Sequence, residues 1–267
     1  MRQTILHGKK VNKMIIDKTT YKATVFDRRV RFLVLHYTQE NFKKSIESLT
    51  GPKVSVHYLV NDQNSDHIFR LVKEQDRAWH AGVSRWKGRN NINDTSIGIE
   101  IVNLGFTLDK EDYKTWYPYP PEQINSVISL CKQIISDYDI APTNVIGHSD
   151  IAPGRKEDPG PLFPWKQLYD NNIGAWYDEE TVKSLMPHID ISNIKAIQEK
   201  FIKYGYGLNP TDIMDLPTKE VISSFQMHFR PSNFSGDLDI ETVAILEALI
   251  EKYYDELALE NRVAYLK

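Results

Sequence analysis

Apolar runs typical of buried strands recur through the first half of the chain. Val30–His36 (VRFLVLH) and Ser96–Val102 (SIGIEIV) are nearly continuous in aliphatic and β-branched residues, the pattern of strands that are covered on both faces. Val54–Asn61 and His67–Val72 have a similar composition and flank a polar turn. Because this turn is longer than two residues, the pair predicts a hairpin with a longer loop.

A helical pattern and one more short strand follow. Within Pro121–Tyr138, apolar residues recur at intervals of three and four, which is the spacing of an amphipathic helix. A short strand is predicted over Asn144–His148, and the loop after it is rich in proline and glycine. Strands and helices in this order predict an α/β domain over residues 1–177.

The last part of the chain has a different pattern. From Ile191 onward it shows helical spacing and no convincing strand, with helices predicted around 194–204, 221–225 and 240–253. Gly205 is placed to end the first of them, and Asp239 to cap the last. We therefore expect a small three-helix domain over 191–267, joined to the first domain by a linker at 178–190.

Charge and composition narrow the classes of function. The chain has 267 residues, 41% of them hydrophobic and 26% charged, with a net charge of −3, which is ordinary for a globular protein. Residues 190–267 hold eight Lys and Arg against thirteen Asp and Glu, a net charge of −5. An acidic helical domain gains nothing from counterion release on DNA, so no nucleic-acid partner is expected.

Two further expectations follow from the sequence. No stretch approaches the roughly 20 apolar residues that span a bilayer, so no membrane span is expected. Met1–Lys18 has scattered lysines and no continuous apolar core, and it is not expected to be a signal peptide. The single cysteine, Cys131, rules out an internal disulfide framework and is interpreted as a small buried hydrophobe.

Candidate metal chemistry lies at the ends of two predicted strands. His36 and His148 each close a strand, and the loop after His148 runs to Lys156 and Asp158. Two imidazoles and a carboxylate form the ligand set of a catalytic zinc site with one open position, although other divalent ions also bind such sets. Taken singly, each residue has a structural explanation: a hydrogen-bonded histidine, or an aspartate in a turn.

Glu100 is harder to explain structurally, because it lies within an otherwise apolar strand. A buried, unpaired carboxylate costs several kcal/mol, so it is expected to have a cationic or metal-bound partner. Gly98 lies on the same face of the strand and leaves room there for another group. The presence of Glu100 together with His36, His148 and Asp158 favours a metal-dependent hydrolase.

Seven segments carry a resemblance to a known family. They are FLVLHYT (32–38), SVHYLV (55–60), AWHAGVSRW (78–86), NDTSIGIEIVN (93–103), VIGHSDIAPGRKEDPGP (145–161), FQMHFRP (225–231) and GDLDIETVAIL (236–246). With them the chain resembles the type-2 N-acetylmuramoyl-L-alanine amidases, in particular the AmpD and AmiD branch and most of all AmiD. The resemblance implies a mixed central β-sheet flanked by helices and a C-terminal peptidoglycan-binding domain.

The resemblance also implies the site. One Zn²⁺ per chain would be held by His36, His148 and Asp158, with Glu100 and Lys156 as catalytic partners. The bond cut would be the amide between the lactyl group of N-acetylmuramic acid, or its anhydro form, and L-Ala of the peptidoglycan stem peptide. Peptidoglycan or muropeptides are the expected partners of a monomeric enzyme of cell-wall turnover or recycling. Its expected place is the bacterial envelope, in the periplasm or secreted.

One departure from the wider family points to the same branch. Phage-type amidases and recognition proteins carry a catalytic tyrosine immediately before a His-aromatic dipeptide, where this chain has Val56 before His57 and Tyr58. Glu100 is therefore expected to carry the proton transfer. The third ligand is Asp158, where those other branches use cysteine.

Further residues are candidates for substrate contact. They are Tyr37, His57, Tyr58, Trp79, His80, Asn103 and Arg155, and Trp86 is a candidate for the same groove. For His57 a structural role beneath the site is an equal alternative, and for Trp79 a role in the core is one. The other histidines, His7, His67, His188 and His228, are expected to be structural or exposed.

Two alternatives remain open from the sequence. The chain could be a non-catalytic peptidoglycan-binding protein, although all five central positions are filled. The C-terminal domain could serve only to stabilise the enzyme.

Overall fold

A computed structural model of the chain describes residues 15–63 and 67–255. Its centre is a five-stranded sheet of order β3-β2-β6-β1-β9. These strands are β1 (Phe32–Tyr37), β2 (Tyr58–Val60), β3 (Ile68–Arg70), β6 (Ser96–Ile101) and β9 (Val145–Gly147). The strands β2, β6, β1 and β9 run parallel to one another, and β3 pairs antiparallel with β2 at one edge. The predicted mixed sheet and its hairpin are confirmed.

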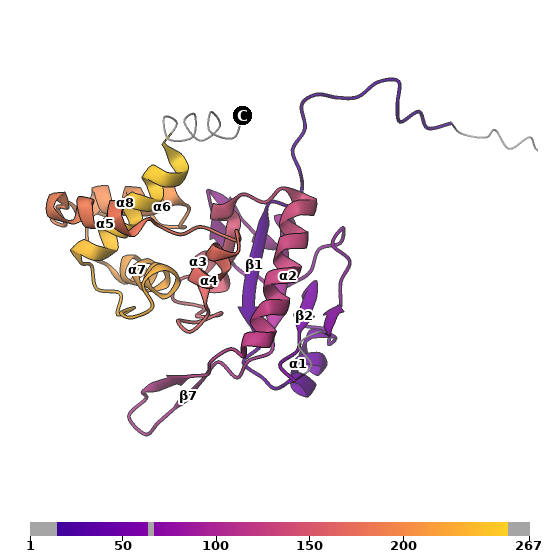
Figure 1. Cartoon of the computed structure of the whole chain (residues 1–267), viewed down its shortest axis with the longest axis horizontal. Coiled ribbons are helices and arrows are strands. Elements are labelled where there is room, and N and C mark those ends of the chain that lie inside the picture. The colour runs from indigo at the N-terminus through magenta and orange to yellow at the C-terminus, as the bar shows by residue number, and fades with distance from the viewer. Residues whose placement is uncertain (1–14, 64–66, 256–267) are drawn as a thin grey trace, which may run out of the picture.

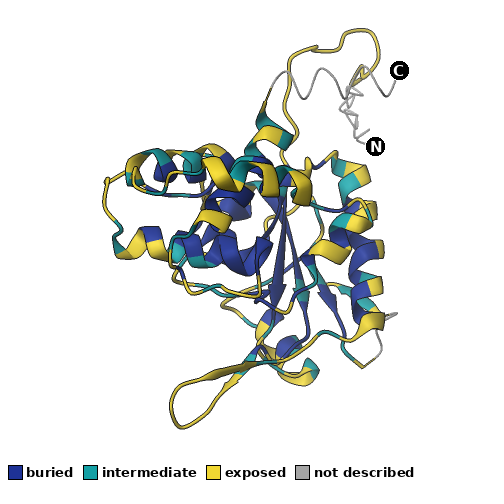
Figure 2. Ribbon diagram, turned by 60° about the vertical axis from the view of Figure 1, so that its left-hand side comes forward, coloured by how far each residue is buried: buried dark blue, intermediate teal, exposed yellow. Residues whose placement is uncertain are grey.

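Helices cover both faces of this sheet. α2 (Pro121–Tyr138) has the predicted bounds and runs alongside β1 in Figure 1. Its buried stripe includes Val127 and Cys131, so the predicted core role of Cys131 is confirmed. The short helices α3 (His148–Ile151) and α4 (Trp165–Asp170) lie toward the C-terminal helices. Figure 2 shows the strands as the most buried layer, between α2 on one side and those helices on the other.

Several short elements were not predicted from the sequence. They are α1 (Phe42–Leu49), the pair β4 (Arg85–Trp86) and β5 (Arg89–Asn90), the hairpin β7 (Phe106–Leu108) and β8 (Lys114–Trp116), and the 3₁₀ turns η1 (Ile92–Thr95) and η2 (Pro142–Asn144). The β7–β8 hairpin projects from the body of the molecule in Figure 1. Two- and three-residue strands are too short for alternation to reveal them.

The C-terminal helical unit contains the three predicted helices. They are α6 (Ile194–Tyr204), α7 (Leu216–Phe229) and α8 (Ile240–Tyr254). Asp239 caps α8 by accepting the backbone N–H of Thr242, and Gly205 follows α6 with a φ of 149°. The segment 178–190, expected to be a linker, instead holds α5 (Glu179–Leu185) and η3 (Met186–His188). α5 packs against α8, and because Val182 is its single buried residue, no helical pattern revealed it.

The hydrophobic core runs continuously from the sheet into the helical unit. Trp86 is 1% exposed and packs edge-on against Tyr204 and Tyr206, with ring centroids 6.1 Å and 4.9 Å away. The prediction that Trp86 lines a substrate groove was therefore wrong. The large indole is buried because Tyr204 and Tyr206 of the helical unit pack against it, a contact that the local sequence does not reveal.

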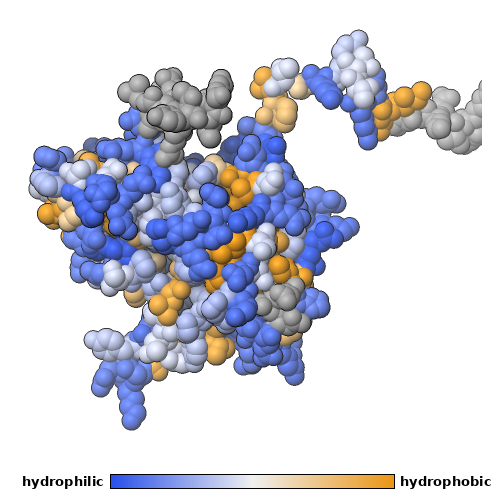
Figure 3. Space-filling view, viewed as in Figure 1, coloured by the Kyte–Doolittle hydropathy of each residue, from blue (hydrophilic) through white to orange (hydrophobic). Residues whose placement is uncertain are grey.

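The surface is mostly hydrophilic, with apolar side chains in a few patches on the face that Figure 3 shows. Within residues 15–63 and 67–255, no helix has the length and apolar character needed to cross a bilayer. Most of Met1–Lys18, and with it His7, lies outside the described residues. His67 and His188 are exposed and His228 is buried, in agreement with the expectation that these residues are exposed or structural.

Candidate active site

Three donor atoms converge where β1 and β9 end. Leu35 pairs with Gly147 in the parallel sheet, so the residues that follow, His36 and His148, lie side by side. The Nδ1 atoms of His36 and His148 are 3.0 Å apart. Oδ2 of Asp158 lies 2.9 Å from the first and 3.0 Å from the second. All three side chains are buried.

This triangle fits a metal ion. Bonds of about 2.0–2.1 Å in a tetrahedral zinc site place neighbouring donors roughly 3.3 Å apart, close to the observed spacing. Burial, and then His148 beside it, lower the pKa of His36 to about 4, so its imidazole is neutral at neutral pH. Burial opposes ionisation of Asp158, but the two histidines still hold its pKa well below the usual range. Neutral imidazoles and an ionised carboxylate are the protonation states that bind metals.

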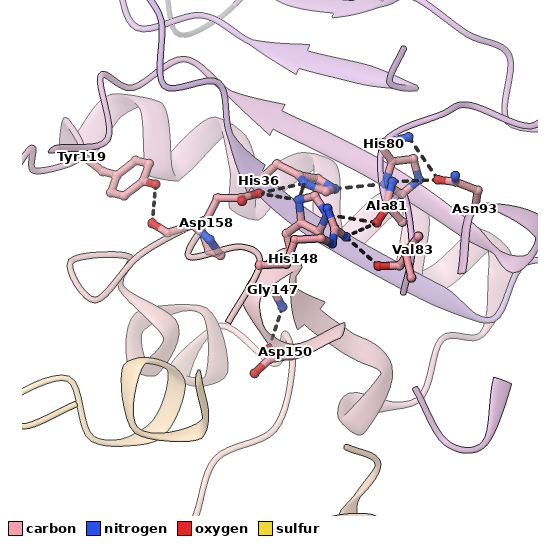
Figure 4. Close-up of polar contacts among 12 residues, drawn as sticks. His36, His80, Ala81, Val83, Asn93, Tyr119, Gly147, His148, Asp150 and Asp158 are labelled. Atoms are coloured by element: carbon pink, nitrogen blue, oxygen red, sulfur yellow. Dashed lines mark hydrogen bonds and ion pairs between the residues drawn. The ribbon is translucent and has the colours of Figure 1, made fainter. Parts of the chain in front are cut away.

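A loop at residues 79–83 supports both histidines from behind (Figure 4). The backbone oxygen of Ala81 lies 3.1 Å from Nε2 of His148. Because a carbonyl only accepts, His148 carries its proton on Nε2 and has a free lone pair on Nδ1. Nε2 of His36 lies 3.0 Å from Nδ1 of His80, whose Nε2 lies 3.1 Å from Oγ of Ser96. Such partners fix the tautomer and direction of metal-binding histidines.

The supporting loop is itself held in place. Oδ1 of Asn93 accepts the backbone N–H groups of His80 at 3.0 Å and of Ala81 at 2.7 Å. Arg155 donates from Nη2 to the backbone oxygens of Ala81 and Val83, at 2.8 Å and 2.7 Å. A Cβ on Gly98 would lie 2.6 Å from the ring of His80, so only glycine leaves room for this imidazole. This explains the space that the glycine in β6 indicated.

Asp158 is fixed from the other side. The O–H of Tyr119 donates to the backbone oxygen of Pro159 at 2.7 Å, directly after Asp158 (Figure 4). The backbone N–H of Ser149 donates to the backbone oxygen of Asp158 at 2.9 Å. The loop that carries the carboxylate is thus tied to α3, which carries His148.

A cavity of about 580 Å³ opens over these groups. Glu100 and Lys156 both line it, together with His148 and Asp158. Oε2 of Glu100 is buried and has no hydrogen-bond partner among the described residues. Burial, and next the charge of Asp158, raise the pKa of Glu100 well above its usual value, while Lys156 opposes the shift. A carboxyl in this state suits proton transfer near neutral pH.

Four of the seven expected substrate contacts line the cavity, namely Tyr37, Trp79, His80 and Arg155. Trp79 is 62% exposed, so it has no role in the core. The structure also brings Phe106 and Lys114 of the β7–β8 hairpin to the cavity, where Lys114 pairs with Glu157. No motif in the sequence marked these two residues.

The other three expected contacts lie away from the cavity. His57 is fully buried and accepts the backbone N–H of Gly98 at 3.0 Å, in agreement with the alternative of a structural imidazole. The O–H of Tyr58 donates to Glu74. The amide of Asn103 donates to the backbone oxygens of Tyr117 and Pro118 and accepts from the N–H of Gly105. None of the three lines this cavity, and their polar groups have hydrogen-bond partners within the protein.

Comparison with known proteins decides the family. A family model described as N-acetylmuramoyl-L-alanine amidase matches residues 26–161, and one described as a putative peptidoglycan binding domain matches residues 191–246. The chain is also 43% identical over 264 residues to N-acetylmuramoyl-L-alanine amidase AmiD of Escherichia coli K12. That alignment covers 93% of this chain and 95% of AmiD. The chain belongs to the N-acetylmuramoyl-L-alanine amidase family.

Solved structures share the fold over most of the chain. AmiD from E. coli, in complex with anhydro-N-acetylmuramic acid-L-Ala-D-γ-Glu-L-Lys as substrate, is 44% identical with a TM-score of 0.82. That match covers 88% of this chain and 94% of AmiD. AmpDh3 from Pseudomonas aeruginosa, in complex with an anhydromuramic pentapeptide, is 46% identical with a TM-score of 0.82. That match covers 90% of this chain and 99% of AmpDh3. The predicted family and amidase activity are confirmed.

Proposed function

We propose that this amidase is zinc-dependent and cuts the amide between the lactyl group of N-acetylmuramic acid, or its anhydro form, and L-Ala of the stem peptide. The observation that carries the proposal is the triangle of donor atoms from His36, His148 and Asp158 beneath the cavity. The substrate that the AmiD structure contains has this amide. Sequence and fold similarity over most of both chains support the transfer of this chemistry.

The three ligands leave a fourth position for water. A zinc ion held there would act as a Lewis acid and lower the pKa of a bound water toward about 7. His80 and the backbone of Ala81 hold the two imidazoles in the tautomers that expose Nδ1. The protein's own contribution is thus a preorganised set of lone pairs.

Glu100 moves the proton in this proposal. It takes a proton from the attacking water as the water oxygen bonds to the lactyl carbonyl carbon. It then delivers that proton to the nitrogen of L-Ala when the carbon–nitrogen bond breaks. The products are a muramic acid carboxylate and a free stem peptide. Its partner-free Oε2 and raised pKa suit it for both steps.

In this proposal, Lys156 stabilises the negative charge that develops on the carbonyl oxygen. Its ammonium lines the same cavity and faces the place where the carbonyl oxygen becomes negative in the tetrahedral intermediate. Tyr37, Trp79 and Arg155 form walls of the cavity that contact the muropeptide. Trp79 offers an exposed aromatic surface to a sugar or peptide group.

The wider assignment has three parts. Residues 1–177 form the catalytic domain, and residues 191–267 form a peptidoglycan-binding domain that brings it to the wall. The segment 178–190 connects them and contributes α5. The enzyme acts as a monomer in the bacterial envelope, in the periplasm or after secretion, during turnover or recycling of the wall.

Product analysis tests this assignment. Purified anhydro-N-acetylmuramyl tripeptide is incubated with the enzyme and the products are identified by mass spectrometry. Release of the intact tripeptide with a free L-Ala amino group is expected, together with intact anhydro-N-acetylmuramic acid. Cleavage within the peptide or at a glycosidic bond would contradict the proposal. Parallel digestion of intact wall shows whether large substrates are also cut.

A further inference from the structure

Asp150 joins the metal-ligand segment to the C-terminal helical unit. It lies on α3, two residues after His148, and is 1% exposed. Its Oδ2 accepts the backbone N–H of Gly147 at 2.7 Å and hydrogen-bonds to Nδ1 of His228 at 2.8 Å. Its Oδ1 accepts the O–H of Tyr206 at 2.6 Å. Figure 4 shows the hydrogen bond between Asp150 and Gly147, below His148 in that view.

Two of these three partners belong to the helical unit. Tyr206 follows shortly after α6, and His228 is the penultimate residue of α7. Both rings pack on aromatic side chains from before residue 178. Tyr206 meets Trp86 edge-on at 4.9 Å, and His228 stacks on Trp165 with ring centroids 3.8 Å apart. Packing therefore holds both polar groups in place against Asp150.

The carboxylate needs these partners, because a buried charge is tolerated only when hydrogen bonds replace its water. One of its partners is the N–H of Gly147, the residue directly before the ligand His148. The backbone that aims His148 at Asp158 is thus held by a carboxylate that is itself held by Tyr206 and His228. Neither of these two residues reaches the catalytic cavity.

We propose that the helical unit positions the metal ligand His148, through Tyr206, His228 and Asp150, in addition to any binding of peptidoglycan. This inference rests on the metal site of the proposed function. Coupling of this kind is reciprocal, so metal binding also favours the packed arrangement of the helical unit. Tyr206 and His228 are positioning residues, and the helical unit is a structural part of the catalytic centre.

The affinity of the full chain for Zn²⁺ tests the proposal. It is measured by competition with a chromophoric chelator, on wild type, Tyr206→Phe, His228→Phe and the double variant. His228→Phe keeps a ring to stack on Trp165 but removes the hydrogen bond to Asp150. We expect each single change to weaken zinc binding several-fold and the double change to weaken it about 10-fold, as for other outer-shell partners. His228→Asn, which retains an N–H donor, is expected to bind zinc more tightly than His228→Phe.

Tyr254→Phe is the matched control. It removes a tyrosine hydroxyl that donates to the backbone oxygen of Tyr204 within the helical unit, away from Asp150. Its zinc affinity is expected to equal that of wild type. All measurements are made well below the melting temperature of each variant, which circular dichroism provides.

The possible results separate the two claims. If the positioning variants melt earlier but bind zinc within twofold of wild type, the contacts only stabilise the fold and the inference is overturned. Should the double variant not fold, Tyr206→Phe and His228→Asn give the same comparison. A wild-type chain that binds no zinc would contradict the proposed function itself, and with it the basis of this inference.

Discussion

His36 and Glu100 occupy directly paired positions in the parallel strands β1 and β6. Side chains at paired positions of neighbouring strands point to the same face, with backbones about 4.8 Å apart. The spacing between a metal ligand and the proposed proton carrier is therefore set by the sheet itself. The metal ligand His36 and the proposed proton carrier Glu100 are thus both held by the central sheet, the most buried part of the molecule.

Glu100→Gln is expected to lower hydrolysis of the muropeptide by roughly 10²- to 10⁴-fold, because the amide cannot accept and return the proton. Zinc content is expected to stay at the wild-type level, since Glu100 is not a ligand. Turnover is measured by chromatography of the released peptide. Glu122→Gln, on the exposed side of α2, serves as the control and should leave the rate unchanged. Wild-type turnover in Glu100→Gln would remove this residue from the mechanism.

Glu100 is also expected to set the acid limb of the pH profile of kcat/KM. Burial and Asp158 raise the pKa of Glu100. As a base it acts when ionised, so activity is present above this raised pKa and is lost as the pH falls through it. The profile of kcat/KM is therefore expected to fall at a pH above the ordinary glutamate value of about 4.3. The residual activity of Glu100→Gln should lack this limb. An acid limb that persists in Glu100→Gln would arise from the titration of another group.

Lys156→Ala is expected to reduce kcat by about 10²- to 10³-fold, the usual loss when one donor to a developing oxyanion is removed. KM should change little, because the charge appears only in the transition state. Steady-state kinetics on the anhydro-muropeptide give both values. Lys166→Ala removes an exposed lysine on α4 and is the control. A large rise in KM at constant kcat would place Lys156 in ground-state binding instead.

His80→Ala is expected to weaken zinc binding by about 10- to 100-fold, because His36 loses the partner that fixes its tautomer and direction. His80→Asn retains an acceptor near the position of Nδ1 and should recover part of the affinity. Chelator competition gives the dissociation constants. His188→Ala removes an exposed histidine on η3 and should have no effect. Equal affinity in His80→Ala and wild type would show that His36 needs no outer partner.

Asn93→Ala is expected to destabilise the fold by about 1–3 kcal/mol, because two backbone N–H groups lose their shared acceptor. Asn90→Ala, at an exposed position of β5, should change the free energy of unfolding by less than about 0.5 kcal/mol. Urea denaturation measures both. A neutral Asn93→Ala would mean that water replaces the side chain at this loop.

Local patterns predicted the elements that carry the site. The apolar runs revealed β1 and β6, and the three- and four-residue spacing fixed the bounds of α2. Because the ends of neighbouring strands meet at the same edge of a sheet, the sequence permitted His36 and His148 to converge, and the family resemblance added Asp158. The family motifs then supplied the roles that spacing alone left open.

Long-range relationships were not predictable from those patterns. The sequence suggested a substrate groove for Trp86 and a structural or exposed place for His228, but it did not show which element would cover either residue. Asp150 and His228 are 78 positions apart, and their contact depends on how the helical unit packs. His80 was expected to contact substrate, and its hydrogen bond to His36 depends on a loop whose position the local pattern does not show. Tertiary packing, rather than any local signal, decides such cases.

The most direct test of the zinc amidase account is metal content measured together with hydrolysis, on the same preparations of wild type and His148→Ala. The account predicts about one zinc per wild-type chain and release of free stem peptide from the anhydro-muropeptide. Both should be lost in the variant, and chelation followed by added zinc should abolish and restore the wild-type rate. Full hydrolysis by a metal-free chain, or restoration by manganese or cobalt far better than by zinc, would contradict it.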